Sequence, residues 1–145
     1  MTSSFRWIAF SVATVASCST FEHRATPEDR FAAVASAIRN EAGPESKECG
    51  FVTLGHDGAA ELACAQAADA AGSPFHVAVQ LRGVDSSIWS LVVLKTSRVR
   101  ELLLWDSNPT GGAGLRPGVS SRACVRFEFA PGISDPISCI AEAAR

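Results

Sequence analysis

The chain has 145 residues, with 13 Lys and Arg against 15 Asp and Glu, and a formal net charge of −2. This length predicts one domain around one hydrophobic core, and the weakly acidic balance argues against a nucleic-acid partner. No apolar stretch reaches the roughly 20 residues that a helix needs to span a bilayer.

An apolar run opens the chain. Residues 7–16, WIAFSVATVA, follow the single charge of Arg6. Ten residues are too short to cross a membrane, but they fit the apolar region of about 7 to 15 residues in a secretory signal. We therefore expect residues 1–17 to be a signal peptide that is removed.

The end of this run, Val15-Ala16-Ser17-Cys18, resembles the lipobox of bacterial lipoproteins. The resemblance implies that Cys18 carries a diacylglycerol on its thiol and a further acyl chain, such as palmitate, on its freed amine. Several acyl chains give stable membrane attachment. Ser19 after the cysteine, rather than Asp, implies the outer membrane facing the periplasm. The alternative is an ordinary signal cut near residue 16 or 17, which leaves Cys18 as a free thiol or in an intermolecular bond.

The mature chain divides into a lipidated cysteine with a short tether, residues 18–25, and a single domain, residues 26–145. A helix is expected to start with Thr26 as cap and Pro27 in its first position. It presents one apolar face and stops at residues 43–44, Gly-Pro. The face consists of Phe31, Val34 and Ile38.

Two elements that each contain a cysteine follow. Residues 49–54, CGFVTL, predict a short strand, and residues 56–58 predict a turn in which Asp57 caps the next helix. Residues 59–71 are rich in alanine and lack β-branched side chains, which favours a helix closed by Gly72. The alternative is the second strand of a disulfide-linked hairpin.

The middle of the chain gives the clearest strand pattern. In residues 75–82, Phe75, Val77, Val79 and Leu81 alternate with more polar residues. This period predicts one buried face, with His76 on the other. Residues 88–96 and 99–105 predict two more strands, so the three form an antiparallel meander.

The last third begins with a loop, residues 106–118, by composition. Residues 123–129 predict one strand with Val125, Phe127 and Phe129 inward, and residues 135–136, Asp-Pro, predict the cap of a short closing helix through residue 144. Together these elements predict an α+β fold with a mainly antiparallel sheet of about five strands and two or three helices.

Besides Cys18, four cysteines remain, and they allow three pairings. We favour Cys49–Cys64 and Cys124–Cys139, because both are local and an exported protein meets an oxidising compartment. Each pair is expected to join a strand to a following helix and to contribute about 3 kcal/mol. The chain lacks a C-x-x-C redox motif and the paired close ligands of a zinc site.

Catalytic motifs are missing from the sequence: it has no G-x-S-x-G, no H-E-x-x-H and no P-loop. His56 and His76 are the candidate residues for a base or metal site, and we expect neither a metal nor a cofactor. Trp89 and Trp105 lie on neighbouring predicted strands. Packing in the core is the default for both, and exposure together would make them a binding platform.

Charges are unevenly placed along the chain. Residues 22–69 hold nine acids and four bases, whereas residues 82–126 hold seven bases and three acids. This split predicts a basic face for an anionic envelope polymer or protein partner. The alternative is that the two halves pair with each other across one fold, or that the charges simply solvate it.

The segments beginning at Cys49 and continuing through CAQAA, PFHVAVQLRGVDS and WDSNPTGG resemble small exported bacterial proteins of unknown function. That resemblance implies no activity. The sequence therefore predicts a membrane-anchored cell-envelope lipoprotein that acts as a non-catalytic binding, assembly or inhibitory module. The alternative is a small periplasmic hydrolase that uses His56 or His76 with an Asp.

Overall fold

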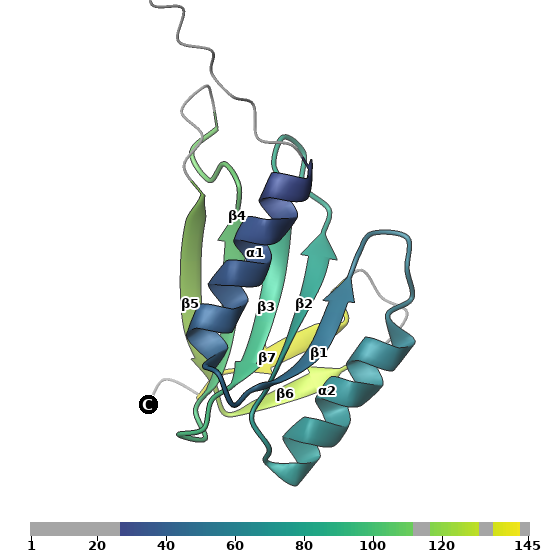
Figure 1. Ribbon diagram of the computed structural model, residues 1–145, viewed down its shortest axis with the longest axis vertical. Helices are drawn as coiled ribbons and strands as arrows, with labels where there is room; N and C mark the ends of the chain where they lie inside the picture. The colour runs from purple at the N-terminus through teal and green to yellow at the C-terminus, as the bar shows by residue number, and fades with distance from the viewer. Residues whose placement is uncertain (1–26, 112–116, 131–134, 143–145) are drawn as a thin grey trace, which may run out of the picture.

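A computed structural model describes residues 27–111, 117–130 and 135–142 (Figure 1). Five strands form one sheet in chain order, and the last two pair as a hairpin. The predicted α+β fold is confirmed, although the main sheet is mixed because β1 runs parallel to β2. The elements are α1 (Pro27–Ala42), β1 (Lys47–Val52), α2 (Ala59–Ala71), β2 (Phe75–Leu81), β3 (Ile88–Leu94), β4 (Arg100–Asp106), β5 (Gly118–Cys124), β6 (Arg126–Phe129) and β7 (Ile137–Ile140).

Both helices follow from their sequences. In α1, the buried side chains Val34, Ala35, Ile38 and Ala42 recur at helical spacing on one face, and the helix ends before a glycine with φ of 81°. In α2, a helix rather than the alternative hairpin strand is confirmed. Its C-terminal cap is Gly72 in the left-handed conformation, whose N–H bonds back to the last turn.

The sheet lies between two layers. Figure 1 shows α1 lying across one face, while the hairpin β6–β7 crosses behind the other. The core on the α1 side includes Ala78, Leu91, Val93 and Leu103. The core on the opposite side includes Phe75, Val77, Val79 and Val92, together with α2 and the hairpin.

One prediction about β2 is corrected by these layers. Its alternating sequence predicts a single buried face, but both faces are buried because α1 covers the face that carries His76 and Ala78. The small side chain of Ala78 leaves room for the helix. His76 is consequently only 3% exposed.

Two predictions for the last third are wrong. Residues 123–129 do not form one strand, because the chain bends at Val125, which is 56% exposed and donates its N–H to the Ile140 carbonyl at 2.7 Å. In place of the closing helix, residues 137–140 form β7, which pairs with β6. Backbone pairing with β6 therefore prevails over the helix signal of the Asp-Pro dipeptide.

Both predicted disulfides are confirmed. Cys49–Cys64 joins β1 to α2, as expected, whereas Cys124–Cys139 joins β5 to β7 rather than to a helix. The predicted signal peptide, Cys18 and the tether lie outside the described residues. Within the described residues, no helix is long and apolar enough to cross a membrane.

Candidate functional site

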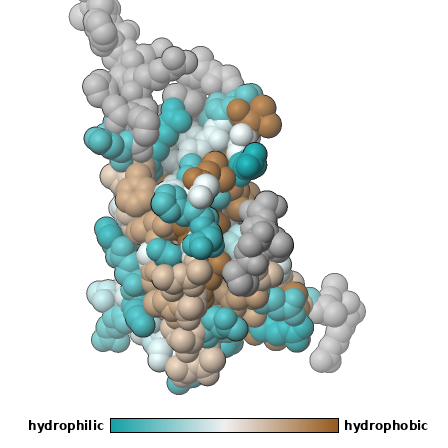
Figure 2. All heavy atoms as spheres, turned by 90° about the vertical axis from the view of Figure 1, so that its right-hand side faces the viewer, coloured by the Kyte–Doolittle hydropathy of each residue, from teal (hydrophilic) through white to brown (hydrophobic). Residues whose placement is uncertain are grey.

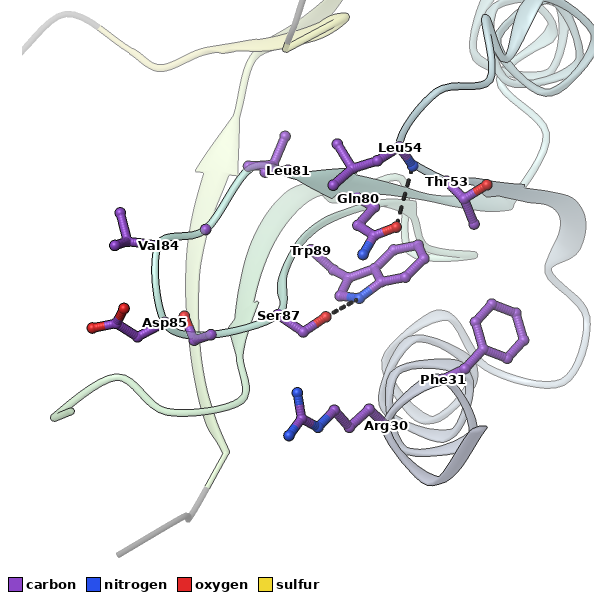
Figure 3. A pocket seen from close by; sticks show the side chains of 12 residues that line it. Arg30, Phe31, Thr53, Leu54, Gln80, Leu81, Val84, Asp85, Ser87 and Trp89 are labelled. Carbon is purple, nitrogen blue, oxygen red and sulfur yellow. Dashed lines mark hydrogen bonds between the residues drawn. The ribbon is translucent and has the colours of Figure 1, made fainter. Parts of the chain in front are cut away.

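Two adjoining hollows lie at the end of the sheet where β1 and β2 finish. Their volumes are about 490 and 510 Å³, and they share Thr53, Leu54 and Gln80; together we call them the end groove. The first hollow lies between the start of α1 and the β2–β3 turn (Figure 3). The second lies beside the β1–α2 loop. Ends of parallel strands are common places for ligands in α/β proteins, and the end groove occupies such a place.

Aromatic side chains support the first hollow. Phe31 of α1 lies with its ring centroid 4.7 Å from that of Phe51 and 6.0 Å from that of Trp89. Phe51 and Trp89 meet edge to face at 6.2 Å. Because the three rings come from α1, β1 and β3, this cluster fixes the helix against the sheet beneath the hollow.

Hydrogen bonds hold the walls of the end groove. The Trp89 indole N–H donates to Ser87 Oγ at 3.1 Å, and the Ser87 backbone N–H donates to Ser107 Oγ at 2.9 Å. The Leu54 N–H donates to Gln80 Oε1 at 3.2 Å, which fastens the β1–α2 loop to β2 (Figure 3). The end groove is therefore built before any ligand arrives, which lowers the entropic cost of binding.

Large apolar side chains at this end are exposed to solvent. Phe31 is 41% exposed, Leu54 is 49% exposed and Val84, in the β2–β3 turn, is 99% exposed. All three line the first hollow, although they come from three separate segments. Figure 2, which views the molecule from its α2 side, shows hydrophobic patches in the upper part interrupted by hydrophilic surface. Clustered exposed apolar side chains mark interaction sites more often than single ones do.

Polar groups surround this apolar surface. Arg30 and Asp85 line the first hollow, and Figure 3 shows the Arg30 guanidinium extending from α1 below Ser87. His56 and Arg82 line the second hollow with Asp57. The N-cap of α2 is Gly58 rather than the predicted Asp57, which lies one residue before it and accepts the Ala59 N–H with its Oδ1 at 3.2 Å. The end groove thus offers charges of both signs around an apolar centre.

Trp89 and Trp105 occupy facing positions on β3 and β4, but they do not form an exposed platform. Trp89 is 4% exposed and Trp105 is 2% exposed, because both lie beneath α1. Trp89 still reaches the first hollow as part of its lining, whereas Trp105 is not among the lining residues. Of the two candidate binding residues, the structure places only Trp89 at the end groove.

The two candidate histidines lie at opposite ends of the parallel strand pair. His56 follows the end of β1, whereas His76 lies at the start of β2, opposite Glu48. His76 Nδ1 is 2.9 Å from Ser46 Oγ, and its Nε2 is 3.8 Å from Glu48 Oε2. Burial lowers the pKa of His76, although the charge of Glu48 opposes that effect.

Neither histidine is paired with an Asp side chain within the described residues. The described part of the chain also holds no group of three or more His, Cys, Asp or Glu side chains placed to bind a metal ion. The structure therefore does not bring His56 and His76 into one site.

Two ion pairs join the acid-rich residues 22–69 to the base-rich residues 82–126. Lys95 contacts Glu41 of α1 at 3.4 Å and Glu101 at 2.9 Å, and the hydrogen bond to Glu101 raises the pKa of Lys95. Arg100 of β4 contacts Asp69 of α2 at 2.7 Å. Lys95 and Arg100 of the second half therefore each pair with an acid of the first half.

Comparison with known proteins adds no relative. No protein-family model, curated protein or solved structure matches the chain. The chemistry of the end groove is therefore argued from its own residues.

Sequence reasoning missed most of the groove lining. The sequence pattern indicates for Phe31 only an apolar helix face shared with Val34 and Ile38, and it indicates no binding role for Leu54 or Val84. Val84 carries the one usable signal, because a large apolar residue between Gly83 and Asp85 is unusual in a turn.

Proposed function

We propose that this chain is a cell-envelope lipoprotein, attached to the membrane through Cys18, whose domain acts as a non-catalytic binding module. The end groove is its binding site, and its partner is an envelope protein. Assembly of an envelope complex and inhibition of an envelope enzyme are both forms of this role.

The anchor is supported by sequence. Residues 15–18, VASC, directly follow an apolar run of signal-peptide length, and two disulfides are consistent with an oxidising compartment outside the cytoplasm. Lipidation also accounts for the odd number of cysteines, since Cys18 is the one left outside the two disulfide pairs.

One observation carries the binding role: Phe31, Leu54 and Val84 expose large apolar surface around one pre-built hollow. A solvent-exposed valine in a tight turn contributes nothing to the core, and apolar exposure of this kind is typical of a contact surface. Nearby charges of both signs suit a protein partner better than a uniformly charged polymer.

The lining of the end groove favours binding over hydrolysis. Its histidine, His56, is adjacent to Asp57, whose carboxylate already accepts the N–H of Ala59 at the start of α2. A hydrolase needs a base held in a fixed direction by a third group, and His56 has no such contact within the described residues.

Cell fractionation tests the anchor. In an exporting bacterial host, the parent chain is expected in the membrane fraction, and Cys18→Ser is expected to lose at least about 90% of that association because no acyl chain remains. Ser17→Ala keeps a small residue before the cysteine and is the matched control, which should stay in membranes. Membrane association of Cys18→Ser equal to the control would contradict the anchor.

Photo-cross-linking tests the end groove. A benzophenone amino acid is placed at Val84, and in the control at Val99, which is 40% exposed in the β3–β4 turn at the opposite end of the sheet. In intact cells, we expect a discrete cross-linked species from position 84 and none from position 99. The same products from both positions, or none from position 84, would contradict the binding role.

A further inference from the structure

The two edges of the five-stranded sheet differ in how they are protected. At one edge, β1 carries Lys47 and Glu48 and has an irregular register between Glu48 and Phe51. Charges and bulges of this kind prevent an edge strand from pairing with another chain. At the other edge, β5 has a single charge, Arg122, and it pairs with β4 over seven successive positions without a shift.

Successive residues of a strand direct their backbone N–H and C=O groups alternately to the two sides, which shows which groups of β5 face outward. Ser107 directly follows β4, and its N–H donates to the Ser87 carbonyl next to β3 at 3.0 Å. Odd-numbered residues of β4 therefore form their backbone hydrogen bonds with β3. Even-numbered residues of β4 therefore bond to β5, where their partners are also even-numbered. The N–H and C=O groups of Val119, Ser121 and Ala123 are left on the outer edge.

The outer edge is open in the described part of the chain. No described strand pairs with β5 on that side, and the residues from Val119 to Ala123 are all exposed. Two residues after Ala123, the N–H of Val125, also an odd-numbered residue, donates to the carbonyl of Ile140. At the hairpin end of this edge, Cys139 Sγ lies 3.8 Å from the Ala123 carbonyl oxygen. Within the described residues, the outward groups of Val119 and Ser121 are accessible and correctly directed for a strand.

We propose that β5 pairs antiparallel with β5 of a second copy of this chain, about a two-fold axis at Ser121. In this register Ser121 faces itself, Val119 faces Ala123, and Ser120 faces Arg122. The outward groups form about six hydrogen bonds between the two copies. The two five-stranded sheets then continue as one, and the partner is a second copy because this segment complements itself.

Side chains support the same register. Arg122 lies opposite a serine rather than opposite its own copy, so no like charges meet directly across the pair. Val119, which is 52% exposed, gains apolar cover from Ala123 of the second copy. The remaining side chains are small, which lets the strands approach to the usual spacing of about 4.8 Å.

Disulfide trapping tests the pairing directly. The full-length protein is purified in detergent with Cys18→Ser, and Ser121→Cys is compared with Val84→Cys, whose position is 99% exposed. The two-fold axis brings both copies of residue 121 to a Cα separation of about 5.5 Å, within disulfide range. Under mild oxidation we expect Ser121→Cys to form a covalent dimer at least about 10-fold faster than Val84→Cys. Equal rates, or no dimer from Ser121→Cys, would overturn the proposal.

Sedimentation velocity gives a second test. Ser121→Pro removes an outward N–H without removing a bond to β4, so it should convert the dimer to the monomer mass. Ser121→Ala keeps the N–H and should stay dimeric. A folded Ser121→Pro protein that remains dimeric would contradict the pairing, and the trapping result decides the question if this variant does not fold. Both tests are independent of the role of the end groove.

Discussion

The middle strands of the sheet and its β5 edge differ in how far other elements bury them. β2 and β3 are buried on both faces, between α1 on one side and α2 with the β6–β7 hairpin on the other, whereas β5 is largely exposed on both. The covered part, β2 and β3 with the elements packed on them, includes the aromatic cluster of Phe31, Phe51 and Trp89 beneath the end groove. The exposed part, β5, has unpaired backbone N–H and C=O groups along its outer edge within the described residues.

This difference separates stability from association. Burial on both faces concentrates the hydrophobic free energy in β2 and β3, so substitutions there should lower stability. Substitutions at the exposed positions 119–123 of β5 should change contacts with other molecules and leave the fold nearly unaffected. The predictions below test this contrast, from the largest effect to the smallest.

Removal of each disulfide should give the largest effects. The two loops have the same sequence separation of 15, so both double Cys→Ala variants should lose about 3 kcal/mol of unfolding free energy. Cys49 is only 8% exposed in the core, and its replacement adds a packing loss. Cys49→Ala with Cys64→Ala should therefore cost more than Cys124→Ala with Cys139→Ala in urea unfolding. The reverse order would contradict the contrast.

A matched pair of valines makes the comparison more specific. Val92 of β3 is fully buried, whereas Val119 of β5 is 52% exposed. Val92→Ala should lower the unfolding free energy by about 2 kcal/mol through lost burial and a small cavity, and Val119→Ala by less than about 0.5 kcal/mol. Chemical denaturation of both variants measures the difference. Similar losses would show that β5 is covered.

The pH dependence of the unfolding free energy tests whether His76 of β2 is buried as described. Burial holds its pKa below 6.5 in the folded protein, so the unfolded chain binds a proton that the folded chain does not. Stability should fall as pH drops through 6.5 toward the lower folded pKa, by at most about 1.4 kcal/mol per pH unit.

Urea unfolding of His76→Gln between pH 7 and 5 measures this effect. The variant should show a flatter dependence than the parent, because it lacks the titrating group. His56→Gln, at an exposed position, is the control and should follow the parent. An unchanged slope in His76→Gln would show that His76 does not cause the acid sensitivity.

Ion pairs should show the smallest contrast. Arg100 and Asp69 join β4 to α2 with side chains 27% and 15% exposed, whereas Arg126 and Glu128 lie on β6 with side chains 64% and 52% exposed. Double-mutant cycles to Ala should give a coupling of about 1 kcal/mol for the first pair and no more than about 0.3 kcal/mol for the second. Equal coupling energies would argue that the two ion pairs do not differ in solvent exposure.

Sequence patterns predicted the elements with strong local signals. The alternation in β2, the Gly72 C-terminal cap of α2 and the spacing of the cysteines were sufficient for those elements. The polar strand β5, residues GVSSRAC, has no apolar alternation and is ordered by pairing with β4, which no local pattern records. The same holds for β7.

The candidate site was harder to predict. Its lining residues lie on α1, the β1–α2 loop and the β2–β3 turn, and only the folded sheet brings these segments together. Phe31 shares an apolar helix face with Val34, but it is 41% exposed whereas Val34 is fully buried. Burial of the two tryptophans depends on where α1 crosses the sheet, which the sequence does not specify.

The intact mass of the protein from a membrane fraction, before and after reduction, tests the central claim most directly. The lipoprotein account predicts a chain that begins at Cys18, carries added acyl mass and gains about four protons when its two disulfides are reduced. An unmodified mass, or a chain that retains residues 1–17, would contradict the lipid anchor.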